Sequence, residues 1–186
     1  SANCPRTVAN WADIVYCNSV GGATNYRYYF DDGAGWTYTY TRNSSGNNMQ
    51  PSNIPGLSYN KTYSVTVASF VSGAWTAYGV SCNLTTPPVP LTTLNSANCP
   101  RTVANWADIV YCNPIGGATN YRYYFDDGAG FTYTYTRNSS ANNMQPSNVP
   151  GLLYNKTYAV QVASYVGGVW SAYGAACNLT APATPP

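Results

Sequence analysis

Six cysteines carry the most distinctive chemistry of this sequence. Cysteines in a chain with few charged residues are typical of proteins that fold in an oxidising, extracellular compartment. Because they fall into two sets of three, one thiol per set stays unpaired if the other two form a disulfide. No CxxC motif and no histidine accompany them, so a zinc site is not expected. The two sets have the same spacing: Cys4, Cys17, Cys82 and Cys99, Cys112, Cys177.

The acidic side chains are six aspartates, since the chain has no glutamate, and it has no histidine either. These absences remove the usual general base and every triad built on histidine. Asp31-Asp32 and Asp126-Asp127 each precede a glycine, which favours a hairpin turn over a calcium site that needs six or more oxygen ligands. Adjacent carboxylates in one turn cannot face each other across a sugar. The sequence therefore predicts no enzyme and no cofactor, with the four aspartates as weak calcium candidates.

Charge and hydropathy exclude two further classes of partner. The formal net charge is only +2, and charged residues make up 8% of the chain, with the basic ones scattered singly. Nucleic-acid binding needs a concentrated basic surface, so it is not expected. No apolar run approaches the roughly 20 residues that a membrane-spanning helix needs.

The chain is an internal duplication. SANCPRTVANWADIVYCN begins at Ser1 and again at Ser96, and 18 positions differ between residues 1–91 and 96–186. A repeat of this length is a whole domain rather than a solenoid unit. The sequence predicts a first domain at 1–86, a Pro/Thr-rich linker at 87–95, a second domain at 96–181 and the start of an equivalent linker at 182–186. We expect the chain to be a piece of a longer array.

The elements that hold these residues are predicted to be short β-strands. No segment shows a sustained 3.6-residue apolar period, whereas alternation with a period of two is frequent. The aspartate turn at 31–35 joins two alternating segments as a hairpin. About seven strands per repeat at this spacing indicate a β-sandwich. In the first repeat, the clearest strands are expected at residues 14–17, 26–30, 36–41, 63–69 and 77–85.

Several motifs resemble fibronectin type III domains. The stretch PGLSYNKTYSVTV carries the family's loop leucine at Leu57, and Tyr63 stands where the tyrosine of the following strand occurs. The segment from Val20 to Arg27 looks like the passage between the second and third strands. The order of motifs over nearly the whole repeat is more similar still to repeats in large surface proteins of Bacteroidota, many of them exported by the type IX secretion route.

The resemblance implies two tandem antiparallel β-sandwiches with a structural or adhesive role at a cell surface. In such a topology Cys4 could pair with Cys82 or with Cys17, and the resemblance favours Cys4–Cys82, hence Cys99–Cys177 in the second copy. Cys17 and Cys112 are then the odd cysteines. Each is interpreted as a buried free thiol, with a covalent link between repeats or chains as the alternative.

Aromatic residues offer candidate contact surfaces. On the strand at 36–41 the favoured interpretation is core packing and cross-strand pairing, and the alternative is an exposed edge that associates with another chain or stacks on sugars. The candidates are Trp36, Tyr38 and Tyr40 with their counterparts Phe131, Tyr133 and Tyr135.

Three functions are therefore expected in descending order. The first is a secreted structural or adhesive segment that self-associates into an oligomer or filament. The second is a carbohydrate-binding accessory module of a secreted enzyme, with surface glycans as its ligands. The third is a passive spacer.

Overall fold

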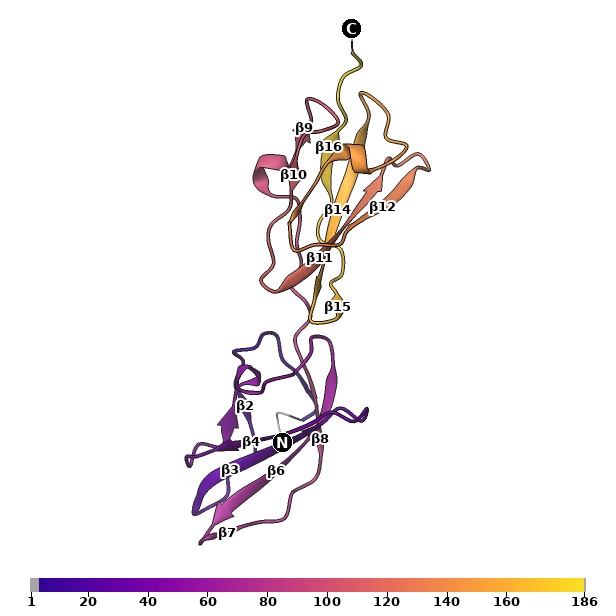
Figure 1. The fold of residues 1–186 in the computed structure, drawn as a ribbon. Helices are drawn as coiled ribbons and strands as arrows, with labels where there is room; N and C mark the ends of the chain where they lie inside the picture. The colour runs from indigo at the N-terminus through magenta and orange to yellow at the C-terminus, as the bar shows by residue number, and fades with distance from the viewer. Residues whose placement is uncertain (1–3, 186) are drawn as a thin grey trace. The chain divides into compact units, whose positions relative to one another are not determined.

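The computed structural model describes residues 4–185, and the chain divides into two compact units, Ser1–Pro88 and Val89–Pro186. Figure 1 shows that each unit consists of strands joined by loops and short helical turns. The boundary differs from the predicted linker at 87–95. Residues 89–95 belong to the second unit, because Thr92 and Leu94 form β-bridges with Val162 and Cys112 of that unit.

The first unit contains a large sheet and a small one. The large sheet has the order β1-β8-β6-β3-β4, with β7 pairing with β6, and the small sheet pairs β2 with β5. All pairs are antiparallel except β1 with β8, which is parallel. The elements are β1 (Arg6–Thr7), β2 (Val15–Tyr16), β3 (Ala23–Asp31), β4 (Thr37–Arg42), β5 (Asn48–Met49), η1 (Pro51–Asn53), β6 (Thr62–Val71), β7 (Ala74–Trp75) and β8 (Cys82–Thr85).

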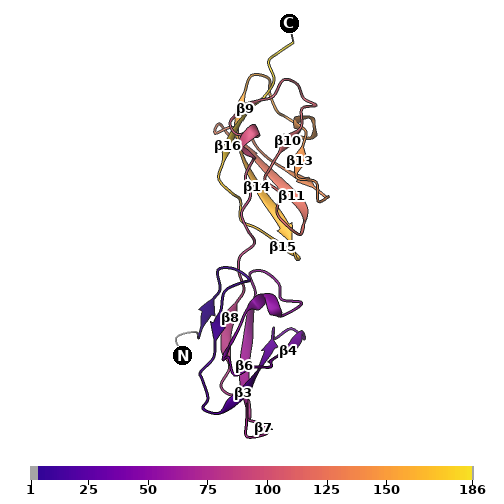
Figure 2. The same cartoon turned by 90° about the vertical axis from the view of Figure 1, so that its left-hand side faces the viewer.

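The second unit has the same topology. Its large sheet runs β12-β11-β14-β16-β9, with β15 pairing with β14, and Figure 2 shows β10 beside β13 in its small sheet. The elements are η2 (Ser96–Asn98), β9 (Arg101–Thr102), β10 (Val110–Tyr111), β11 (Ala118–Asp126), β12 (Thr132–Arg137), β13 (Asn143–Met144), η3 (Pro146–Asn148), β14 (Thr157–Val166), β15 (Val169–Trp170) and β16 (Cys177–Thr180).

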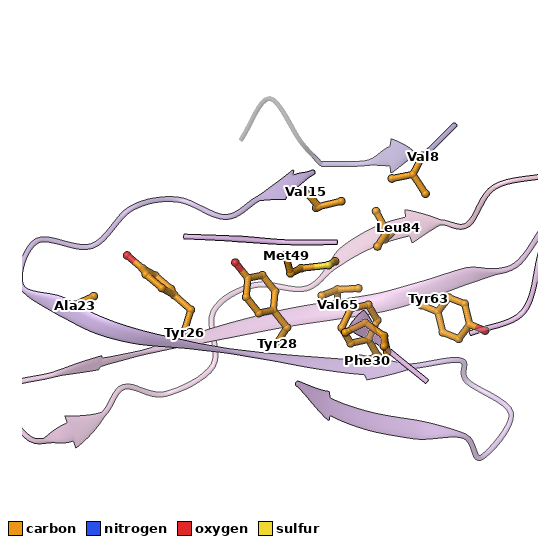
Figure 3. Close-up of a cluster of buried hydrophobic side chains, with 11 residues drawn as sticks. Val8, Val15, Ala23, Tyr26, Tyr28, Phe30, Met49, Tyr63, Val65 and Leu84 are labelled. Carbon is orange, nitrogen blue, oxygen red and sulfur yellow. The ribbon is translucent and has the colours of Figure 1, made fainter. Parts of the chain in front are cut away.

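Period-two alternation places one face of β3 in the core. Tyr26, Tyr28 and Phe30 are all buried, and Figure 3 shows them on the side of the sheet that faces Val15 and Met49 of the small sheet. Fully burying a large apolar side chain contributes about 1.5–3 kcal/mol, so this row of aromatic rings is a major source of stability. The fold is all-β with two similar sandwiches, as the sequence predicted.

Buried tyrosines need partners for their hydroxyl groups, and each one finds a nearby partner. The Tyr26 hydroxyl accepts a hydrogen bond from the backbone N–H of Val20 at 3.0 Å, and the Tyr63 hydroxyl accepts one from Ser58 at 2.9 Å. These bonds tie two loops to the sheet. A core rich in tyrosine therefore also fixes the loop conformations around it.

The strand predicted at 77–85 is shorter in the structure. Only Cys82–Thr85 forms a strand there, while Ala74–Trp75 returns as β7 directly after a tight turn at Ser72 and Gly73. Both turn residues have positive φ, 49° and 84°, and glycine adopts such values without strain. Within the described residues, none of the helical turns has the length and apolarity that crossing a bilayer requires.

Candidate functional site

Two disulfides close the two sandwiches. Cys4 bonds to Cys82 and Cys99 bonds to Cys177, the pairing that the resemblance favoured, with 5.5 Å between the Cα atoms in each case. Each bridge ties the segment before the first strand of its unit to the start of the last strand, 78 residues along the chain. Closing a loop of this length stabilises the fold by roughly 4–5 kcal/mol in the chain-entropy model.

The odd cysteines are free thiols at the end of the small sheet. Cys17 is half-buried, and its sulfur accepts a hydrogen bond from the Tyr28 hydroxyl at 3.4 Å. Cys112 receives the equivalent bond from Tyr123 and is fully buried. Burial raises the pKa of both thiols, and the tyrosine hydrogen bond opposes that effect. Both groups are therefore weakly reactive, and Cys17 is the more accessible.

The aspartate pair forms the predicted hairpin turn. Asp32 Oδ1 accepts hydrogen bonds from the N–H groups of Ala34 at 2.7 Å and Trp36 at 2.9 Å, and Oδ2 accepts one from Lys61 Nζ at 2.5 Å. The hydrogen bond from Lys61 is the main reason that the pKa of Asp32 falls to about 2. Asp31 Oδ1 accepts a hydrogen bond from the N–H of Gly33 at 2.8 Å.

The second unit repeats this arrangement with Asp126, Asp127 and Lys156. Both oxygens of each inner aspartate are thus engaged by backbone amides and a lysine. Among residues 4–185, no three cysteine or aspartate side chains cluster in a way that would hold a metal ion. What these carboxylates do in the structure is hold the turn between β3 and β4.

The candidate contact aromatics of the 36–41 strand turn toward the core. Trp36, Tyr38 and Tyr40 are partly buried and pack against the core cluster, while Thr37 and Thr39 alternate with them on the exposed face of β4. Phe131, Tyr133 and Tyr135 follow the same half-buried pattern at β12. Since β4 ends the order of its sheet, its free edge presents backbone groups beside a threonine face.

A second aromatic cluster lies on the outer face of the large sheet, apart from the candidate contact residues of the 36–41 strand. The Arg27 guanidinium lies 4.0 Å from the centroid of the Trp75 ring, and the Phe70 and Trp75 rings are 5.2 Å apart. Tyr29 contacts Tyr78, whose ring is 44% exposed. The signal was present in the alternation of β3, because residues 27 and 29 must face away from the buried 26, 28 and 30.

This outer-face cluster, made of Arg27, Tyr29, Phe70, Trp75 and Tyr78, has the chemistry of a stacking platform. Its counterpart in the second unit places Arg122 4.1 Å from the Trp170 ring. A guanidinium over a tryptophan face is a favourable cation–π contact, and aromatic faces also stack on sugar rings. Among the described residues the buried Arg27 Nε has no hydrogen-bond partner, while the guanidinium carbon lies over the Trp75 ring.

The first unit also has a concave site. A cleft of about 570 Å³ opens in this unit, and both sheets line it. Tyr28, Val67 and Cys82 come from the large sheet and Met49 from the small sheet, with Cys17 and Gly79 from adjoining segments. Most of its lining is apolar, which is the usual character of a binding cleft. Sequence reasoning missed the cleft, because its lining comes from strands and loops that lie far apart along the chain.

Comparisons with known proteins support the fold rather than a particular function. No protein-family model and no curated protein sequence matches this chain. A two-domain fibronectin type III segment of chicken tenascin matches with a TM-score of 0.56 and 13% identity, over 91% of this chain and 98% of the tenascin segment.

Two other chicken structures also match this chain. The chicken interferon gamma receptor alpha chain matches with a TM-score of 0.50 and 14% identity, over 91% of each chain. The FN1-FN3 domains of chicken CNTN1 match with a TM-score of 0.40 and 10% identity; the match covers 94% of this chain and 61% of the CNTN1 chain. The tenascin match, together with the observed sheet order, shows that this chain folds as two tandem fibronectin type III-like β-sandwiches.

Proposed function

We propose that this chain is a structural and adhesive repeat segment of an extracellular surface protein, whose copies associate into an oligomer or filament. The observation that carries the proposal is the tandem of two near-identical sandwiches, each closed by its own disulfide. Near-identical neighbours suit a role that depends on length and repeated contacts.

The proposed extracellular location rests on the disulfides. Disulfide bonds persist in oxidising compartments and are rare in the cytosol. The low charge content and the tyrosine-rich strands agree with a secreted β-protein. We extend the proposal to the surface proteins of Bacteroidota exported by the type IX route, on the strength of the motif order in each repeat. The full-length parent sequence tests this extension: a parent without further copies or an export signal would contradict it.

The free edge of β4 supports association between copies. An edge strand presents unpaired N–H and C=O groups that can pair with another strand. On β4 the exposed side chains Thr37 and Thr39 are short and uncharged, so they would not repel an approaching strand. Cys17 is the accessible odd thiol, and it is the group through which a covalent link would form.

The solution mass of the native chain, measured with and without reductant, tests this proposal. We expect species larger than 20.0 kDa. Their loss on reduction would indicate a disulfide between chains, for which Cys17 is the accessible candidate, and their survival would indicate noncovalent contacts. A sharper version compares two lysine substitutions. Thr39→Lys on the edge strand β4 should abolish association, whereas Thr24→Lys on the interior strand β3 should not. A monomer under all conditions would contradict self-association.

Carbohydrate binding is the second candidate, and the outer-face cluster favours it. An exposed tyrosine beside a tryptophan and an arginine can stack on a sugar and donate hydrogen bonds to its hydroxyls. The double variant Trp75→Ala/Trp170→Ala should abolish saturable glycan binding. Tyr111→Ala, which removes an exposed aromatic ring from the small sheet, serves as the control. If neither glycan binding nor association occurs, the passive spacer becomes the better proposal.

A further inference from the structure

The second unit contains a strand-like segment that the described part of the first unit does not. Residues 91–95 run in extended form between the two sheets of the second unit, bridging Thr92 to Val162 and Leu94 to Cys112. Thr92 is 2% exposed and Leu94 is 3% exposed, whereas Leu91 points outward at 60%. The segment therefore buries a threonine and, two positions later, a leucine.

Hydrogen bonds fix the register of the 91–95 segment. The Thr92 hydroxyl donates to the carbonyl of Asn113 at 2.6 Å, and the N–H of Asn113 donates to the carbonyl of Thr93 at 2.9 Å. The N–H of Asn95 donates to the carbonyl of Tyr111 at 3.0 Å. Three bonds to the end of β10 make the segment an added strand of the small sheet rather than a passing loop.

Gly174 makes room for this segment. A Cβ at position 174 would lie 2.0 Å from the Thr92 carbonyl oxygen, a distance that no real side chain tolerates. Glycine is therefore required at the point where the two backbones approach most closely.

The first unit has the same residues at the positions that contact the 91–95 segment in the second unit, but in the first unit these residues line the open cleft. Tyr16, Asn18 and Gly79 stand at the positions of Tyr111, Asn113 and Gly174 in the repeat, and all three line the cleft. The N–H of Cys17 bonds to Asn47 of the loop before β5. The carbonyl of Tyr16 and the N–H of Asn18 consequently point away from β5, toward the cleft.

The residues beneath the 91–95 segment are more buried than their counterparts in the open cleft of the first unit. Val162 and Cys112 are fully buried beneath the 91–95 segment, while their counterparts Val67 and Cys17 are only partly buried. The first unit does not need glycine at position 79 for its own packing. A Cβ there would meet only the Val67 carbonyl oxygen at 3.6 Å, an ordinary contact.

We infer that the cleft of the first unit is an acceptor site for an extended peptide strand with a Thr-x-Leu pattern, supplied from outside these two units. Strand addition of this kind takes affinity from main-chain hydrogen bonds and specificity from alternate side chains. Within the described residues 4–185, the 91–95 segment is the one strand of this kind, and it already fills the groove of the second unit. Exchange of this segment between two copies would therefore fill the groove of one first unit only by opening the groove of a second unit. The inference stands independently of the proposed filament.

Protection of the Cys17 thiol in the full chain tests this inference. The probe is a synthetic peptide with the sequence of residues 88–95, and labelling by a thiol reagent is followed separately at Cys17 and Cys112 by mass spectrometry. At a peptide concentration ten times the dissociation constant, labelling of Cys17 should slow about tenfold. Labelling of Cys112 should not change. The same peptide carrying T92D and L94D should give no protection, because it would bury two charges.

Gly79→Ala is the matched protein variant. Its added methyl group fits the open cleft but would block the close approach of a strand, as at Gly174. We expect unchanged Cys17 labelling without peptide and no protection with it. Absence of protection of the wild-type chain at millimolar peptide would overturn the inference, as would equal protection of Gly79→Ala. If Cys17 became protected without peptide as the protein concentration rose, copies of the chain would be exchanging their own segments. That result would contradict the inference that the strand comes from outside these two units.

Discussion

Gly174 lies so close to the Thr92 carbonyl that any side chain at position 174 would collide with residues 91–95. This contact joins a loop near the end of the chain to the segment that begins the second unit. Its counterpart in the first unit, Gly79, has no such neighbour among the described residues. The contrast between two glycines at equivalent positions leads directly to the first prediction.

Gly174→Ala should destabilise the second unit, because the new methyl group would force the backbone at Thr92 away. Overpacking of this kind costs about 1–3 kcal/mol. Labelling of Cys112 should accelerate as the 91–95 segment lifts from it. Gly79→Ala is the control and should leave the unfolding midpoint within experimental error. Equal effects of the two substitutions would show that the close contact does not hold the segment.

Leu94→Ala should lower the free energy of unfolding of the second unit by about 2–5 kcal/mol, since it empties space beside the fully buried Cys112. Leu91→Ala, three residues earlier in the same segment, should have almost no effect because Leu91 is 60% exposed. Chemical denaturation of both variants measures the difference. Similar losses for both leucines would mean that the segment is not anchored by Leu94.

Asp32→Asn should remove a pH-dependent contribution to stability. The pKa of Asp32 falls from 3.8 to about 2 because Lys61 binds its ionised form. The contribution is therefore present above pH 3.8 and is lost as the pH falls toward 2. Thermal unfolding should show wild type more stable than the variant at about pH 6, with the difference gone at about pH 2. Asp31→Asn, which keeps the Asp32–Lys61 pair, should retain most of this pH dependence.

Tyr28→Phe should make the Cys17 thiol less acidic. Burial raises the pKa of Cys17 and the hydrogen bond from Tyr28 lowers it, so loss of the hydroxyl removes the larger of the two effects that oppose burial. The pH profile of the iodoacetamide labelling rate at Cys17 should shift to higher pH. Tyr26→Phe loses a hydroxyl that bonds to Val20 instead, and its profile should match the wild type. A profile for Tyr28→Phe that does not move would rule out this role of the hydroxyl.

The local parts of the fold could be predicted from the sequence. Alternation in β3 and the Asp-Asp-Gly turn depend on neighbouring residues, so the hairpin of β3 and β4 is readable without knowledge of the rest of the chain. The same alternation does not say which face lies inward when both carry tyrosines. That is why Tyr38 and Tyr40 were the candidates for contact, rather than Trp75 and Tyr78 of the outer-face cluster.

Features that depend on distant segments could not be predicted. The two-residue strand β1 exists because β8 lies beside it in parallel, far along the sequence. Residues 91–95 looked like a linker because prolines precede them, yet the groove that receives Thr92 and Leu94 is formed by β10 and β14. A short extended segment has no periodicity long enough to reveal that it will be buried.

The repeat that can be counted in the sequence and the repeat that folds are out of phase. Counting starts at Ser96, but the second sandwich takes its first strand-like residues from the stretch after Pro88. A second sandwich that began at Ser96 would lack residues 91–95, and the groove that receives Thr92 and Leu94 would stand open. During synthesis on the ribosome, residues 91–95 emerge before β10 and β14, which form the groove. They therefore remain exposed to solvent until β14 has been synthesised and can pair with Thr92.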